Sequence, residues 1–129
     1  MRYLLLIYAE EPTEAPPPDV AAAELQGYNA FTEDIRRRGL FIAGEALHPT
    51  STATTVQIKD GVLITTDGPF AETKEALGGF YLVEARDLDE AIELAGRIPA
   101  AKHGSIEVRP IWEFGEAPMG SAEAAGVAG

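Results

Sequence analysis

The sequence predicts an α+β domain of ferredoxin-like βαββαβ topology with an inserted β-hairpin. Along the 129 residues, the segments follow one another as strand, helix, strand, hairpin, strand, helix, strand. This order makes two βαβ-like halves. Right-handed crossovers would place both helices on one face of a single sheet. The length fits one domain, which we expect to span residues 1–114.

The first half begins with a strand at 3–8, where apolar residues occupy both faces. A Pro- and Glu-rich loop is expected at 10–18, after which Asp19 is expected to cap a helix. Gly39 should end that helix in a left-handed backbone conformation. Apolar residues at three- and four-residue steps form one stripe of the helix: Leu25, Tyr28, Phe31 and Ile35.

The middle of the chain predicts a strand at 40–47 and then a hairpin. Residues 54–59 alternate between two faces, and residues 62–65 return as the second strand. The Asp60-Gly61 pair between them is a strong signal for a two-residue turn.

The second half predicts a strand at 77–85, a helix, and a last strand at 105–114. Asp87 and Glu90 indicate a capping box at the start of the helix, and Pro99 should stop it. Residues 115–129 are mostly Ala, Gly, Ser and Glu, and we expect them to form a disordered tail. The stripe of the helix comprises Leu88, Ala91, Ile92, Ala95 and Ile98.

Placing both helices on one face leaves the opposite face of the sheet uncovered. The strands at 3–8 and 77–85 are nevertheless apolar on both faces, and a large apolar surface must be covered. No further helix is available, so the simplest cover is a second copy of the sheet in a two-fold homodimer. The alternative is a monomer with an unusually apolar sheet.

The charge balance and the lack of cysteine exclude several classes of function. A net charge of −11 should repel nucleic acid and anionic membrane surfaces. The chain has no cysteine, and its two histidines lack ligand spacing, so we expect no metal and no other cofactor. The apolar run at the start is too short for a signal peptide, and no later stretch could span a membrane. The cytoplasm is therefore the expected location.

The run Asp67-Gly68-Pro69-Phe70-Ala71-Glu72-Thr73-Lys74-Glu75 is the most specific motif of the chain, and it continues into Leu77-Gly78-Gly79-Phe80. Three further segments accompany it: Met1 to Tyr8, Ala43 to Leu47, and Pro99 to Pro110. Together they resemble the DGPF-domain branch of the YCII-related proteins, over almost the whole chain before the tail.

The resemblance implies a dimeric α+β barrel for which no reaction is established. Many DGPF-domain proteins are thought to be encoded near sigma factors of the extracytoplasmic-function class, which implies a regulatory setting. The wider YCII-related group has a proposed catalytic His–Asp pair, with the histidine near the start of the first helix. This chain has no histidine between Asp19 and Leu25, so that pair is not carried over.

Asp67, Glu72 and Lys74 are candidate site residues, because a plain turn requires none of their charges. Asp67 could act as a general base, or it could only hold the turn that precedes Gly68. Glu72 and Lys74 would point the same way in an extended segment. They form either a salt bridge that orders the loop or a pair in which Lys74 binds an anion. Phe70 is expected in the core.

Four residues outside the motif complete the candidates. His103 precedes the last strand, and it is a candidate acid or base because imidazoles titrate near neutrality; the alternative is an ordinary exposed histidine. Arg109 could hold a carboxylate or pair with Glu107. Tyr8 and Glu45 end neighbouring strands and could line the same cleft.

Two functions are compatible with these residues. In the first, a cofactor-free enzyme of isomerase or lyase type holds a small polar or anionic molecule between helices and sheet. Asp67 and His103 would move protons, and Lys74 or Arg109 would hold a negative group. In the second, the protein is a ligand-binding or regulatory module without catalysis, linked to a sigma factor. The sequence has neither a phosphate loop nor a nucleophile elbow.

Overall fold

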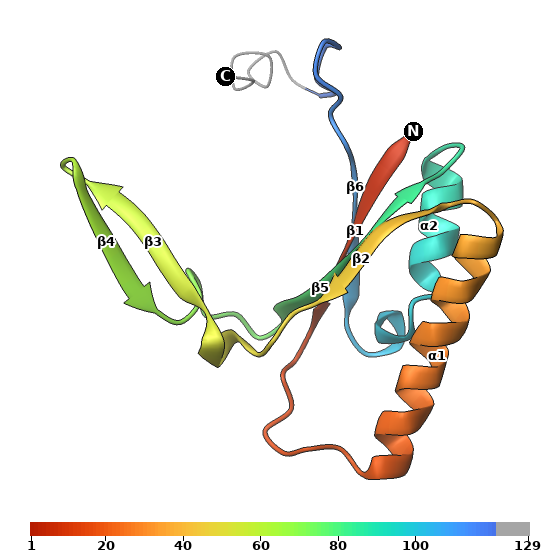
Figure 1. Ribbon diagram of the computed structural model, residues 1–129, viewed down its shortest axis with the longest axis horizontal. Helices are drawn as coiled ribbons and strands as arrows, with labels where there is room; N and C mark the ends of the chain where they lie inside the picture. The colour runs from red at the N-terminus through yellow and green to blue at the C-terminus, as the bar shows by residue number, and fades with distance from the viewer. Residues whose placement is uncertain (121–129) are drawn as a thin grey trace.

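The computed structural model describes residues 1–120 and confirms the α+β class. Four strands form the main sheet in the order β2-β5-β1-β6 (Figure 1), and each neighbouring pair is antiparallel. This order is compatible with the predicted ferredoxin-like topology. Most of the tail predicted at 115–129 lies outside the described residues. The strands are β1 (Arg2–Ala9), β2 (Phe41–Ala46), β5 (Ala76–Glu84) and β6 (Ser105–Pro110).

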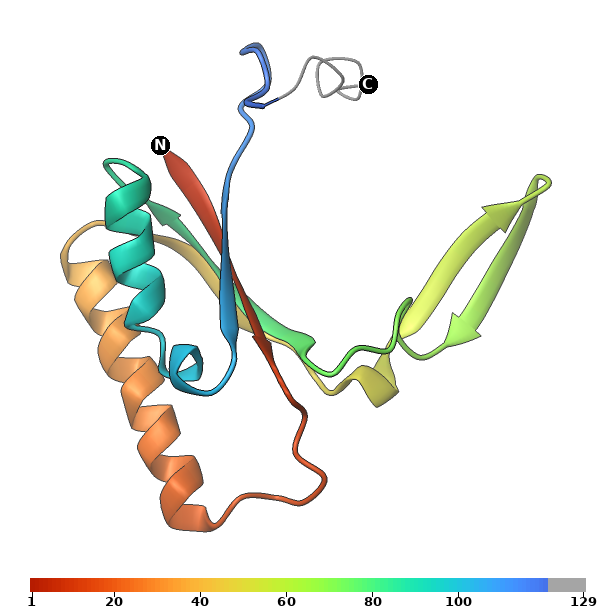
Figure 2. The ribbon, with the colours of Figure 1, turned by 180° about the vertical axis from the view of Figure 1, so that it is seen from behind.

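Helices α1 (Pro18–Arg37) and α2 (Leu88–Gly96) cover the same face of this sheet, which we call the inner face (Figures 1 and 2). Neither helix among residues 1–120 has the length and apolarity that crossing a bilayer requires. The core lies between the helices and the inner face, where full burial of a Leu or Ile side chain contributes ~1.5–3 kcal/mol. Its buried residues are Tyr3, Leu5, Ile7, Phe31, Ile35, Tyr81, Val83, Ala85, Ala91, Leu94, Ala95, Ile98 and Ala100.

The start of α1 differs from the prediction. Pro18 occupies the first helical position, where its fixed φ suits the helix and its missing N–H is not needed. Asp19 therefore lies inside the first turn and makes no capping hydrogen bond, although its charge suits the positive end of the helix dipole. After the other end, Gly39 has a φ of 74°, which confirms its predicted role as terminator.

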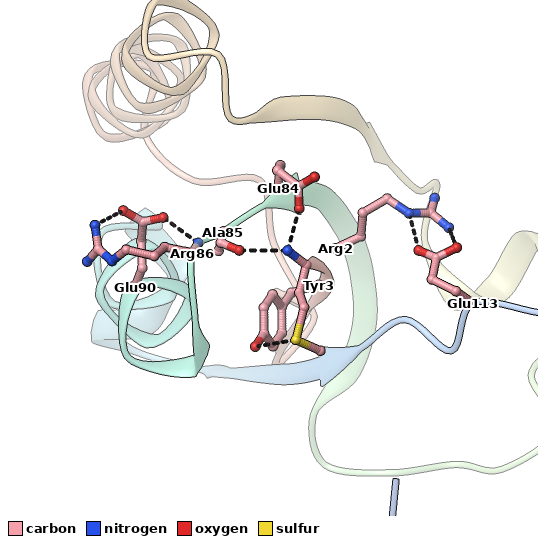
Figure 3. Close-up of polar contacts among 8 residues, drawn as sticks. Arg2, Tyr3, Glu84, Ala85, Arg86, Glu90 and Glu113 are labelled. Carbon is pink, nitrogen blue, oxygen red and sulfur yellow. Dashed lines mark hydrogen bonds and ion pairs between the residues drawn. The ribbon is translucent and has the colours of Figure 1, made fainter. Parts of the chain in front are cut away.

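The predicted cap of α2 by Asp87 is confirmed, whereas Glu90 reaches one residue further back than a capping box requires. The Asp87 side chain accepts a hydrogen bond from the Glu90 N–H at 2.9 Å. The Glu90 carboxylate in turn accepts from the Arg86 N–H at 2.8 Å (Figure 3). The first bond satisfies one orphan donor of the helix, and the second ties Glu90 to the residue before the cap.

The predicted apolar stripe of α2 is only partly correct. Leu88 and Ile92 are 50% and 53% exposed, whereas Leu94, which the stripe omitted, is fully buried. The residues that face the sheet are spaced as i, i+3, i+4 and i+7 from Ala91, which is the ordinary pattern of one helix face. α2 is followed by the 3-10 helix η2 (Pro99–Lys102).

The last strand is shorter than predicted. β6 pairs only with β1, and Tyr3 of β1 lies opposite Pro110. One further hydrogen bond, from the Ile111 N–H to the Arg2 carbonyl, has a length of 2.9 Å, and beyond it β1 offers no partner. The Arg2 guanidinium then holds the Glu113 carboxylate through two hydrogen bonds of 2.7 and 2.8 Å (Figure 3).

Strands β3 (Thr54–Lys59) and β4 (Val62–Asp67) form a separate two-stranded sheet, which confirms the inserted hairpin. Asp60 and Gly61 have φ values of 50° and 77°, so both central residues of the turn are left-handed, as a type I′ turn requires. The hairpin follows the short 3-10 helix η1 (Thr50–Thr52). It projects from the body on the side away from both helices (Figures 1 and 2).

The outer face of the main sheet, opposite the helices, carries a row of apolar side chains. Leu4 of β1 lies opposite Leu82 of β5, and Leu6 lies opposite Phe80. All four alternate with residues of the core, so they point away from the helices. Within residues 1–120, no helix lies over this face (Figures 1 and 2).

Candidate functional site

A cleft of about 450 Å³ opens between α1 and the end of the sheet where β1 and β2 finish. Its floor is made of small residues on the inner face, and its walls come from α1 and from the segment around η2. The lining residues are Ile7, Ala9, Glu24, Leu25, Tyr28, Asn29, Thr32, Gly44, Glu45, Ala46, Gly78, Gly79, Phe80, Tyr81, Ala100 and His103.

The cleft exists because two neighbouring strands, β2 and β5, carry small residues where their inner face meets α1. Ala46 of β2 lies opposite Gly79 of β5, and Gly79 lies opposite Ile7 of β1. A Cβ atom on Gly79 would lie 2.8 Å from the Glu45 carbonyl oxygen, so the backbone geometry leaves no room for a side chain there. A larger residue at Ala46 would fill the cleft instead.

The wall formed by α1 corrects the sequence-based view of its apolar stripe. Phe31 and Ile35 are buried as predicted, but Leu25 is 61% exposed and lines the cleft instead of packing in the core. Further along, the Thr32 and Tyr81 hydroxyls share a hydrogen bond of 2.8 Å at the inner end of the cleft.

Two glycines bring His103 to the mouth of the cleft. A Cβ atom on Gly27 would lie 3.1 Å from Pro99 Cγ, so Gly27 lets η2 pack tightly against α1. A Cβ atom on Gly104 would collide with the Tyr8 carbonyl oxygen, so only glycine allows the chain to pass β1 this closely. His103 lies between these two contacts, directly after η2.

His103 and Glu24 lie next to each other at the mouth of the cleft. His103 Nε2 lies 3.6 Å from Glu24 Oε1, which is an ion-pair distance and slightly too long for a direct hydrogen bond. Both side chains are partly exposed, at 59% and 43%, so solvent and small molecules reach them. A histidine beside a carboxylate can accept and return a proton.

Tyr28 adds a hydrogen-bond donor to the same wall. Burial raises the pKa of the Tyr28 phenol above its ordinary value, and the nearby Glu24 carboxylate raises this pKa further. The phenol therefore stays protonated at neutral pH and can donate to an oxygen atom of a bound molecule.

Of the residues predicted from the sequence, the structure brings His103 and Glu45 to this cleft. Strand alternation directs the Glu45 side chain to the outer face, since its neighbours Gly44 and Ala46 face the cleft. Asp67 is the last residue of β4, where it lies opposite Thr54, and it does not line the cleft. Phe70 was expected in the core, but it is 80% exposed, because the motif lies in a loop outside the body.

The remaining candidates lie elsewhere on the surface. Tyr8 and Lys74 line a shallow depression beside β6, and Lys74 Nζ lies 3.7 Å from Glu10 Oε1. Glu72 is exposed and does not pair with Lys74. Arg109 Nε lies 2.6 Å from Glu107 Oε2, which is the local pairing that the sequence left open. Among residues 1–120, no three acidic or histidine side chains form a group that could hold a metal ion.

Sequence reasoning missed Glu24, Tyr28 and Thr32 as a set. They occupy positions i, i+4 and i+8 of α1, and such positions lie above one another on a helix. A row of polar or amphipathic residues beside the apolar stripe was the available signal. This row indicates a site only where small residues of the sheet lie opposite it. The strand register brings those residues under α1, and the register could not be read from the sequence of α1.

Comparison with known proteins assigns the chain to a family. The chain belongs to the YCII-related family, because residues 1–115 match the YCII-related domain. An uncharacterised protein of Rhizobium meliloti (strain 1021) is 47% identical over 76 residues, which cover 56% of this chain and 61% of that protein. The match thus spans less than two thirds of the relative's length.

Proposed function

We propose that the protein binds a small molecule in the cleft beside α1 and moves a proton on it without a cofactor, as an isomerase or lyase does. The observation that carries this proposal is the pairing of His103 with Glu24 at 3.6 Å on the rim of an apolar cleft. Catalytic contacts are often long before the substrate is bound, and such a pair tightens around it.

The roles follow from the chemistry of the three side chains. One member of the His103–Glu24 pair would take a proton from a carbon next to a carbonyl group, and the protonated pair would return it to another carbon. The Tyr28 phenol would donate a hydrogen bond to the carbonyl oxygen, where negative charge develops. Proton transfer of this kind needs no metal ion and no redox partner.

The lining of the cleft favours a neutral or cationic ligand with an apolar body. Its charged side chains are Glu24 and, when protonated, His103, because the Glu45 side chain points to the outer face, and the lining contains neither Lys nor Arg. The cations that were expected to hold an anion, Lys74 and Arg109, lie outside the cleft and beside carboxylates. An anionic ligand would instead meet Lys74 in the shallow depression.

Two further features belong to the proposal. The motif from Asp67 to Glu75 supports membership of the DGPF branch of the family. The uncovered outer face, with Leu4, Leu6 and Leu82 in one apolar row, supports a homodimer in which two sheets meet face to face. In that dimer each protomer keeps its own cleft, since the cleft lies on the helix side.

Exchange of hydrogen for deuterium tests the reaction without a known substrate. The protein is incubated in D2O with a panel of neutral and cationic carbonyl compounds, and the loss of C–H signals is followed by NMR. Wild type should exchange at least one compound. His103→Gln and Glu24→Gln should lower the rate at least ~100-fold, the low end for general acid–base catalysis.

The control for this experiment is His48→Gln, which removes the only other histidine and lies outside the cleft. It should leave the exchange rate unchanged. Binding of a compound in the cleft without any exchange would favour the non-catalytic binding module. If neither binding nor exchange responds to a cleft-filling Ala46→Leu, the cleft is not the site.

A further inference from the structure

We propose that the β3–β4 hairpin is an arm that packs against a second copy of this chain, so that the two copies of the dimer clasp each other. The inference rests on the proposed homodimer, but it assigns a separate role to a different part of the molecule. The sheet-face contact alone involves only the outer face of the main sheet.

The first observation is the isolation of the hairpin. β3 and β4 form their own sheet, and they project away from the body in both views (Figures 1 and 2). The hydrogen bonds at its root join its two ends to each other: the Gly68 N–H donates to the Ala53 carbonyl at 2.8 Å, and the Thr55 hydroxyl donates to the Gly68 carbonyl at 2.9 Å. A two-stranded hairpin is at best marginally stable by itself in water, so this one requires a surface to pack on.

The second observation is that apolar side chains are exposed on both faces of the hairpin. Val56, Ile58 and Leu63 share one face and are 57%, 71% and 63% exposed. Val62 and Ile64, on the other face, are 60% and 39% exposed. A protruding pair of strands with this composition would drive aggregation if it stayed uncovered.

The third observation is the charge of the hairpin. The chain carries a net charge of −11, yet the hairpin residues 54–67 contain one cation, Lys59, and two anions, Asp60 and Asp67, so they contribute only −1. The outer face is similarly balanced where Arg109 pairs with Glu107. These two surfaces are therefore the ones that a second, equally acidic copy can approach without strong repulsion. A basic partner would be attracted to the acidic surfaces instead.

The fourth observation is the area that a stable dimer needs. Four strands about 4.8 Å apart and about 20 Å long give the outer face an area of only ~400 Å². A stable interface buries roughly 800 Å² on each partner. One face of the hairpin offers ~200 Å², and the surface that receives the partner's hairpin adds a similar area. In a two-fold pair each copy both extends its own hairpin and receives the hairpin of its partner. Adding these two areas to that of the outer face brings the buried area of each copy to the required size.

Sedimentation equilibrium on two variants separates the arm from the sheet. Ile58→Ser/Leu63→Ser changes only the arm, and Leu6→Arg changes only the outer face. We expect wild type to be a dimer, the arm variant to dissociate at least ~10-fold more readily, and Leu6→Arg to be monomeric. Because the hairpin is separate from the core, the arm variant should keep the melting temperature of the body, and Glu93→Gln on the surface of α2 serves as the control.

Photo-crosslinking locates the arm directly. A benzoyl-phenylalanine at Ile58 should link two copies in purified protein, whereas the same group at Glu93 should not. If wild type is a monomer, the proposed homodimer and the proposed arm are both wrong. Wild type could instead be a dimer while the arm variant dissociates no more readily and position 58 links no second copy. That result would contradict the arm and leave the sheet-face dimer in place.

Discussion

At the scale of single residues, the site depends on glycines more than on charged groups. Gly27 and Gly104 permit backbone approaches that place His103 beside Glu24, and neither glycine touches a ligand in the proposed mechanism. Replacing a charged residue removes its charge and hydrogen bonds but leaves the backbone where it is. A glycine at a close approach can be replaced only if the neighbouring segment moves.

We expect Gly104→Ala to lower the free energy of unfolding by ~1–3 kcal/mol, the usual range for an added group without space. The new methyl group would collide with the Tyr8 carbonyl oxygen and displace the segment that carries His103. Urea unfolding measures the change. Gly96→Ala is the matched control, because nothing lies within 4 Å of the position that its methyl group would take, and alanine favours a helix. Equal stabilities for the two variants would contradict the prediction.

The sequence revealed His103 as a candidate but not its partner. An isolated histidine before a strand is visible in any sequence, because few residues titrate near neutrality. Glu24 looked like an ordinary surface acid of α1, and its proximity to His103 depends on the Gly27–Pro99 contact between segments far apart in the chain. Asp67 was a candidate because it belongs to the most specific motif of the chain. The structure places it on the hairpin, away from the cleft.

At the scale of elements, one carboxylate ties α1 to α2. Asp34 of α1 accepts from Arg97, the residue that follows α2, at 2.9 Å, and from Arg38 at 3.4 Å. The hydrogen bond from Arg97 is the largest cause that lowers the pKa of Asp34 below its ordinary value, and Arg38 lowers it further. The two helices are thereby held together at the edge of the core.

This pair predicts a pH dependence of stability. Because the pKa of Asp34 is lower in the folded state than in the unfolded chain, its stabilisation is present above the unfolded value of about 3.9 and is lost as the pH falls further. Asp34→Asn should therefore be less stable than wild type at neutral pH, and the difference should shrink in acid. Urea unfolding at pH 7, 5, 4 and 3 measures it, with Glu33→Gln as control. A difference that does not change with pH would contradict the assignment.

Element types and order were predictable, because each depends on local patterning. The Asp60-Gly61 turn and the Asp87 cap are local signals, and both appear as predicted. The end of β6 was not predictable in this way. Nothing in residues 111–114 forbids a strand, and the limit is set by where β1 begins, at the far end of the chain.

At the scale of the whole molecule, charge and apolar surface oppose each other. Each copy carries a net charge of −11, while the half-buried apolar row of the outer face and the exposed apolar side chains of the hairpin favour association. Salt shortens the range of the repulsion to about 10 Å at 0.1 M, but it leaves the apolar attraction in place.

Raising NaCl from about 0.02 to about 0.3 M should therefore strengthen the proposed dimer. Sedimentation at both salt concentrations measures the dissociation constant, which should fall. A neutral osmolyte at matched osmolarity is the control for effects of water activity. A dissociation constant that rises with salt would show that ion pairs, and not apolar surfaces, hold the copies together.

The position of β1 in the middle of the sheet has a consequence for biosynthesis. β1 pairs on one side with β5, which begins at Ala76, and on the other with β6, which ends at Pro110. At about 5–20 residues per second, the ribosome needs roughly 5–20 s to make the hundred residues that follow β1. Until β5 has been made, Leu4, Leu5 and Leu6 have no strand to pair with, and one edge of β1 stays unpaired until β6 follows. The apolar first strand is therefore the segment that a ribosome-bound chaperone would need to shield.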